Sequence, residues 1–449
     1  MSFEKNTLQN SGIYRLKVNT LPKRSSLSNF LILLTLALVI FSFKWQLAGV
    51  GEGGVRVDDF AIVGLFLLVA SEIKIKDITH PLIRAYLIFV LYSGCVAVYN
   101  GIAGRVDLAI SLLFALRLLE YLVFFFVGLV IFRRGLDKYV WLILRVYVFY
   151  LIIIIPLQII GIIPVISGFS NTRAIGNTNG PYELAAIAAG LSLLFLYSRR
   201  IALFWISIVI CLAAAARITS VCLVLIILWN FRFFLLQQGR FWGDLNKATL
   251  VLIALIIATP IALTRLSLDF GVSGSGGDVV SLIDRLAEVS PTEFVEQLAE
   301  NYDSAITYQT AKDYQNSAFE DAIAAARDQG GGDVSGLIRT YRWGTLLRAT
   351  FSTPLGAAFG LGPSFGTSAV DGYYVRLICE TGLIGLSIFL LWLFKSFRSK
   401  ILPPWLKGYL VVMAATAIFI DIFVSFKPMI LIWLFFGLAA ASMQRRTEQ

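Results

Sequence analysis

The sequence contains few charged residues and few of the residue types that build metal sites. Only 15% of the 449 residues are charged, and there are one histidine and four cysteines. The cysteines all fall in hydrophobic runs and lack metal-ligand spacing, which indicates neither disulfides nor a metal site. His80 precedes Pro81 at the start of another hydrophobic run, where we expect an interfacial residue. The sequence therefore predicts no metal and no cofactor.

Long apolar runs, in contrast, dominate the chain. Hydrophobic residues make up 58% of it and the mean hydropathy is +0.79, values far from those of soluble domains. A membrane-spanning helix needs about 20 mostly apolar residues. We count twelve such runs, at 29–46, 58–72, 81–99, 107–132, 139–165, 181–198, 201–216, 218–236, 247–264, 373–394, 405–424 and 428–443. The pattern predicts an all-α polytopic membrane protein with about 12 transmembrane helices.

Lysine and arginine gather in every second connection between these runs, for example at Arg133 and Arg134. Because short cytoplasmic loops carry an excess of positive charge, this distribution predicts that both termini are cytoplasmic. The net charge of +10 is then mainly a signal of topology. Nucleic acid is not an expected partner.

The runs and the polar segments between them divide the chain into consecutive parts. These are a cytoplasmic segment (1–28), transmembrane helices 1–9 (29–264), an outer loop (265–372), transmembrane helices 10–12 (373–443) and a cytoplasmic tail (444–449). The first part of the outer loop, 265–338, has thirteen carboxylates against four basic residues, and its apolar spacing predicts amphipathic helices. Its second part, 339–372, is basic and rich in glycine. We expect the chemistry in this second part.

Several arginines lie on the predicted outer face, where the charge rule would not place them. Arg217 lies between two hydrophobic runs with almost no loop to solvate it, and Arg173 lies among glycine and asparagine residues that favour tight turns. Arg339 and Arg342 lie in the basic part of the outer loop. Guanidinium groups bind phosphate oxygens in a bidentate manner, so these four residues predict an anion site.

The motifs around these arginines resemble the O-antigen polymerase and O-antigen ligase family of bacterial envelope glycosyltransferases. The resemblance is carried, in chain order, by RAIGNTNGP at 173–181, Arg217, RTYRW at 339–343, PLGAAFGLGPS at 354–364 and DGYYVRLICETGLIG at 371–385. It implies a GT-C-like fold whose large, mostly helical periplasmic loop lies between helices 9 and 10. It also implies metal-independent glycosyl transfer at the periplasmic face of the bacterial inner membrane. The implied partners are an oligosaccharide linked to undecaprenyl pyrophosphate, membrane lipids and a chain-length regulator protein.

The resemblance also suggests roles for individual residues. We expect Arg217 and Arg339 to clamp the pyrophosphate, with Arg173 and Arg342 as second choices. Asp371 stands where ligases of the family have a histidine, which favours a polymerase. It either accepts the proton of the acceptor hydroxyl or positions the acceptor sugar, and a nearby arginine would lower its pKa; a helix N-cap is the structural alternative.

Four further residues are predicted to contact the substrate. Trp343 and Tyr373 can stack on sugar rings. Glu183 and Glu380 can bind sugar hydroxyls or pair with arginines.

The function predicted from the sequence is thus that of a polymerase. It transfers a growing glycan from its carrier to a new lipid-linked repeat unit. The alternatives are a ligase that transfers the glycan to lipid A core or to a protein, and, from another class, a secondary transporter or flippase. A sugar transferase that uses polyprenyl-phosphate monomers is a further alternative, with Asp58 and Asp59 as its acidic pair.

Overall fold

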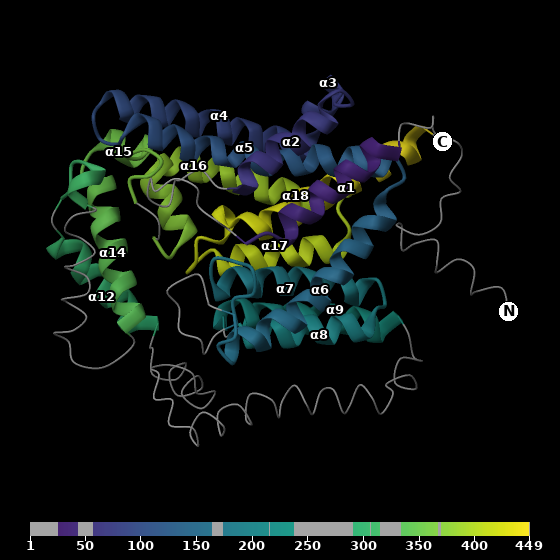
Figure 1. Cartoon of the computed structure of the whole chain (residues 1–449). Helices are drawn as coiled ribbons and strands as arrows, with labels where there is room; N and C mark the ends of the chain where they lie inside the picture. The colour runs from purple at the N-terminus through teal and green to yellow at the C-terminus, as the bar shows by residue number, and fades with distance from the viewer. Residues whose placement is uncertain are drawn as a thin grey trace, which may run out of the picture.

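The computed structural model contains only helices as regular elements in the residues it describes (Figure 1). The described residues are 26–43, 57–163, 174–214, 216–237, 291–305, 307–314, 334–366 and 370–448. The predicted span 247–264 and Arg173 lie outside them. The all-α prediction is confirmed for the described residues.

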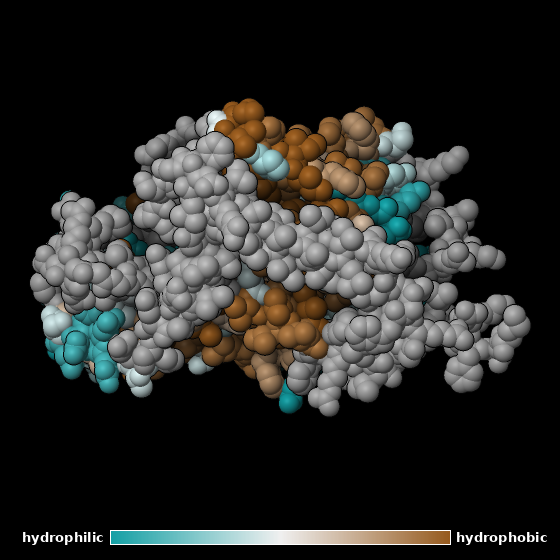
Figure 2. Space-filling view, turned by 90° about the horizontal axis from the view of Figure 1, so that it is seen from below, coloured by the Kyte–Doolittle hydropathy of each residue, from teal (hydrophilic) through white to brown (hydrophobic). Residues whose placement is uncertain are grey.

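Five of the described helices are long and apolar enough to cross a membrane. They are α4 (Pro81–Ile102), α5 (Leu108–Arg133), α6 (Asp137–Ile159), α16 (Tyr373–Arg398) and α18 (Phe426–Glu448). Many large apolar side chains on these helices point outward, among them Leu91 and Ile153, and the middle of the visible surface is apolar where it is described (Figure 2). Such surfaces are energetically favourable in contact with lipid tails and unfavourable in contact with water. The chain is therefore a helical membrane protein.

Shorter apolar helices coincide with most of the other predicted spans. They are α1 (Ser26–Phe41), α2 (Val57–Ala70), α7 (Pro181–Tyr197), α8 (Ile201–Ala213), α9 (Arg217–Gln237) and α17 (Pro404–Thr416). The apolar run 405–424 does not form one continuous helix, because α17 ends at Thr416. An irregular segment with a short 3₁₀ helix, η3 (Ile422–Val424), then leads to α18. Apolar composition alone could not reveal this interruption.

The remaining helices gather around the two ends of the bundle. The helices α12 (Pro291–Ser304), α14 (Val334–Phe351) and α15 (Pro354–Phe359) lie beside one end, on the left in Figure 1, and we call this the α14 end. The short α3 (Ile75–Ile78) lies at the opposite end, where α5 finishes at Arg133, and we call this the basic end. The helix α14 runs across residues 338 and 339, where the composition changes from acidic to basic.

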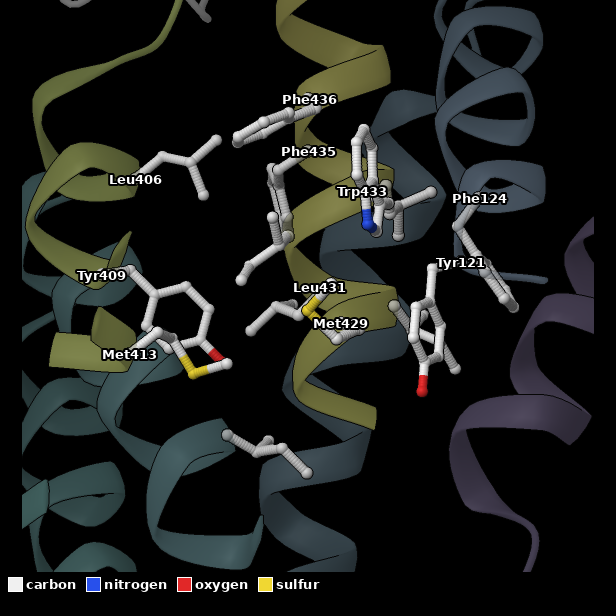
Figure 3. Packing of buried hydrophobic residues seen from close by; sticks show 14 of the residues in the cluster. Tyr121, Phe124, Leu406, Tyr409, Met413, Met429, Leu431, Trp433, Phe435 and Phe436 are labelled. Carbon is white, nitrogen blue, oxygen red and sulfur yellow. The ribbon is translucent and has the colours of Figure 1, made fainter. Parts of the chain in front are cut away.

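Two glycines allow the central helices α5 and α18 to approach closely. A Cβ atom on Gly128 would lie 2.2 Å from the carbonyl oxygen of Leu434, and one on Gly437 would lie 2.0 Å from that of Phe125. Small residues at such crossings bring helix backbones into contact in membranes. Aromatic side chains, including Trp433, fill the space beside this crossing (Figure 3). The resulting rigid core supports the polar groups at both ends of the bundle.

Candidate functional site

Asp371 lies in a tight turn, residues 370–372, that leads into α16 at the α14 end. Its backbone has a positive φ of 56°, a region in which aspartate is one of the few tolerated non-glycine residues. The N–H groups of Val370 and Gly372 donate to the carboxylate of Asp421 at 3.0 and 3.3 Å. The Nε1–H group of Trp343 donates to the carbonyl oxygen of Val370 at 3.0 Å. Two side chains from outside the turn therefore fix the backbone on both sides of Asp371.

The helix N-cap alternative for Asp371 is wrong. The N-cap residue of α16 is Gly372, which has no side chain that could cap the helix. The carboxylate of Asp371 is instead directed toward α14, and its side chain is 39% exposed. The group is thus placed to meet a ligand.

Arg339 and Arg342 of α14 bring two guanidinium groups to this turn. The Nη1 atom of Arg342 lies 3.7 Å from Oδ2 of Asp371. The Nε atom of Arg339 is buried and has no hydrogen-bond partner among the described residues. A buried donor without a partner costs about 1–3 kcal/mol. An anionic ligand that reached Arg339 would remove this cost, so the arrangement favours anion binding.

A third guanidinium group belongs to Arg376 in the first turns of α16. This side chain is only 2% exposed, and its Nη1 atom lies 3.2 Å from Oδ2 of Asp421. Its Nε atom lies 3.3 Å from Oε1 of Glu380. With Asp371 and the two arginines of α14, the site thus contains three guanidinium groups and three carboxylates. The formal charges of these six groups balance.

The pKa of Asp371 is raised above its ordinary value, mainly because the surrounding protein removes part of the carboxylate from water and so disfavours its charged form. Arg339 opposes this effect most strongly, Asp421 adds to it, and Arg342 and Arg376 oppose it further. The arginines lower the pKa as the sequence predicted, but burial outweighs them. A raised pKa makes Asp371 a better proton acceptor.

Glu380 lies just before a break in α16 at a glycine. The helix breaks at Gly382, where φ is 68°. Two carbonyl groups of its first half then accept hydrogen bonds from the N–H groups of Leu361 and Gly362 at 2.7 and 3.1 Å. The carboxylate of Glu380 accepts one from the N–H group of Ser364 at 3.3 Å. Glu380 is 8% exposed, so it supports the site from within and is not open to bulk solvent.

Arg217 begins α9, and the first turn of this helix lies near the start of α16. The hydroxyl of Thr416 donates to that of Thr219 at 3.2 Å. The next residue, Ala417, accepts a hydrogen bond from the N–H group of Tyr373 at 2.9 Å. The structure does not describe the side chain of Arg217. Its backbone is thus near the site, and its role in the clamp stays a prediction.

The residue that follows Arg173, Ala174, lies at the same end of the bundle. The described chain resumes at Ala174, whose N–H group donates to the carbonyl oxygen of Ala213 at 3.2 Å. Ala213 ends α8, shortly before Arg217. The predicted anion-binding role of Arg173 itself lies outside the described residues.

Glu183 belongs to a different polar network at this end of the bundle. Its carboxylate accepts hydrogen bonds from the N–H groups of Asn179 and Lys427 at 2.8 and 3.1 Å. The ammonium group of Lys427 donates to the carbonyl oxygens of Ile40, Ser42 and Asn177. This network joins the end of α1 to the starts of α7 and α18. Glu183 is 1% exposed, which indicates a structural role and not the predicted sugar contact.

The predicted stacking of Trp343 and Tyr373 on sugar rings is wrong, because both rings are buried. Trp343 is 6% exposed and stacks on Phe419 with ring centroids 6.0 Å apart. Tyr373 is 2% exposed and packs against Phe389 and Phe423. The protein itself occupies the space that a sugar would need.

The sequence predictions missed Asp421, which contacts both Arg376 and the turn that contains Asp371. Asp421 is the only acidic residue in the apolar stretch 414–426. An ionisable residue inside an apolar stretch is a functional hypothesis by default, so this signal was available. Its partners lie elsewhere in the sequence, and only the folded chain identifies them.

Searches of protein-family models, of curated proteins and of solved structures found no match to this chain. Among the described residues, no group of three or more histidine, cysteine, aspartate or glutamate side chains is arranged to bind a metal ion. The function is therefore inferred from the site and from the sequence motifs.

Proposed function

We propose that this protein is a membrane glycosyltransferase that polymerises lipid-linked oligosaccharide repeats. The donor is a glycan chain on undecaprenyl pyrophosphate, and the acceptor is the terminal sugar of a new lipid-linked repeat. The observation that carries the proposal is the pairing of Arg339 and Arg342 with Asp371 at one end of a membrane-embedded bundle. It combines two anion-binding groups with one proton acceptor.

The proposed reaction uses these groups as follows. The acceptor hydroxyl oxygen attacks the anomeric carbon of the donor, and the bond from this carbon to the pyrophosphate oxygen breaks. Asp371 accepts the hydroxyl proton, and the leaving pyrophosphate takes the bonding electron pair. Arg339 and Arg342, with Arg217, stabilise the negative charge that develops on the pyrophosphate. No step requires a metal ion.

The transfer can be tested with purified protein reconstituted in liposomes. The substrate is undecaprenyl-pyrophosphate-linked repeats, isolated from a deletion strain of the source bacterium that does not make this protein. We expect a ladder of polymer lengths without any other acceptor, because a polymerase uses lipid-linked repeats on both sides of the reaction. A ligase would give product only after lipid A core or an acceptor protein is added.

The Arg217→Ala variant tests the part of the clamp that the structure describes only by its backbone. We expect single repeats and no ladder, because one of the charges on the leaving pyrophosphate would lose its partner. Arg398→Ala is the matched control, since Arg398 ends α16 at the basic end and its guanidinium group lies over the ring of Phe394 in a cation–π arrangement. A normal ladder from Arg217→Ala would remove Arg217 from the clamp.

A further inference from the structure

The turn 370–372 holds Asp371 in a conformation that needs support from its surroundings. Left-handed backbone in a non-glycine residue generally persists only where neighbouring groups determine it. Asp421 supports the turn through two N–H groups, and Trp343 supports it through the carbonyl oxygen of Val370. Of these two residues, Trp343 lies on α14, the helix that also supplies Arg339 and Arg342, whereas Asp421 does not.

Trp343 is itself tightly fixed. A Cβ atom on Gly372 would lie 2.5 Å from Cζ2 of the indole, so the ring lies directly against the turn. Its other contacts are with Phe419 from the segment after α17 and with Phe294 of α12, whose ring centroid is 5.5 Å away in an edge-on arrangement. The indole is thus packed between α12, the segment after α17 and the turn.

We propose that Trp343 is a positioning residue that places the Asp371 carboxylate opposite the two arginines of α14. This rests on the proposed function, in which Asp371 accepts the proton. Because Trp343 directly follows Arg342, one short stretch of α14 fixes both partners of the 3.7 Å contact between Arg342 and Asp371. A displacement of about 1 Å at a reacting group can reduce a rate by about 100-fold. Loss of the indole N–H group therefore affects the rate more than substrate binding.

The test compares Trp343→Phe with the matched control Trp392→Phe. Trp392 lies on α16, is 1% exposed, and donates its Nε1–H group to the carbonyl oxygen of Leu82 at 3.2 Å. Each variant loses one buried indole-to-carbonyl hydrogen bond and keeps an aromatic ring. We expect both to lower the melting temperature similarly. Only Trp343→Phe should lower kcat for the ladder reaction, by about 10- to 100-fold, with KM changed less than about twofold.

Hydrogen exchange of the purified full-length protein gives a second measurement that does not depend on activity. We expect the amides of residues 370–373 to exchange faster in Trp343→Phe and at the original rate in Trp392→Phe. Unchanged exchange in Trp343→Phe, or an equal loss of kcat in both variants, would overturn the positioning role.

The Asp371→Asn variant separates this inference from the proposed function. We expect it to lose the ladder, because the amide cannot accept the hydroxyl proton. If Asp371→Asn kept normal polymerisation while Trp343→Phe still accelerated exchange, Trp343 would fix the turn but the proposed role of Asp371 would be refuted. If Asp371→Asn lost the ladder and Trp343→Phe did not, the positioning role would be refuted and the proposed function would stand.

Discussion

The two ends of the helical bundle use arginine in different ways. At the basic end, Arg133 makes two hydrogen bonds of 2.5 and 2.8 Å to the carboxylate of the fully buried Asp77. The same guanidinium group also reaches the side chain of Gln444 in α18 at 3.1 Å. At the α14 end, Arg342 and Asp371 are 3.7 Å apart, and the carboxylate is partly exposed. The first arrangement is a closed structural pair, and the second is open to a ligand.

A second arginine at each end shows the same difference between a closed structural contact and an open site. Arg134 at the basic end contacts Glu72, Ser28 and Asn29, so it connects α5 to α1 and to the end of α2. At the α14 end, the buried Nε of Arg339 has no hydrogen-bond partner among the described residues. An arginine whose donors are used by the protein stabilises the fold, whereas an arginine with unused donors has capacity for an anion. The two ends can therefore be distinguished by mutation.

The largest expected effect is on activity, from Arg339→Ala. In the proposed reaction this variant removes a donor to the leaving pyrophosphate, and the loss of one such donor typically reduces kcat by about 100- to 1,000-fold. The melting temperature should not fall, because the Nε group of Arg339 has no hydrogen-bond partner among the described residues. Ladder formation and thermal unfolding of the same preparation measure the two quantities. A large loss of stability with unchanged kcat would make Arg339 a structural residue like Arg133.

Arg133→Ala should give the opposite result. It leaves Asp77 buried without its cation, and breaking a buried pair in this way costs about 3–5 kcal/mol of unfolding free energy. The folded fraction should polymerise normally, because the basic end lies far from the site in Figure 1. Denaturant titration in detergent, followed by activity per folded molecule, tests this. Unchanged unfolding free energy would show that the contacts at the basic end are not structural.

The smallest expected effect is a shift in the pH dependence of kcat for Arg342→Gln. If Asp371 is the proton acceptor, kcat rises with pH as this carboxyl group loses its proton. Arg342 lowers the pKa of Asp371, so its removal raises that pKa and moves the acid limb of the profile to higher pH. The substitution Arg398→Gln at the basic end should leave the limb in place. An acid limb that did not move, or that moved to lower pH, would exclude Asp371 as the titrating base.

Much of the site was predictable because its motifs are local. The basic stretch that begins at Arg339, and Asp371 at the entry to a helix, were identified from the sequence, and the structure brings them together. The burial of Trp343 was not predictable, because an aromatic residue beside arginines suits both a sugar platform and a packed core. Its partner Phe419 lies after α17, in a run that the sequence predicted to be one continuous helix.

The sequence by itself determined that the chain is a bundle of membrane helices, because the length and apolar character of each run are local properties. It also identified Arg339, Arg342 and Asp371 as candidate site residues. Only the tertiary structure decided that Asp421 fixes the turn around Asp371 and that Glu183 belongs to a separate network. These contacts join residues that are distant along the chain, and Asp421 lies in the irregular segment that begins where α17 ends at Thr416.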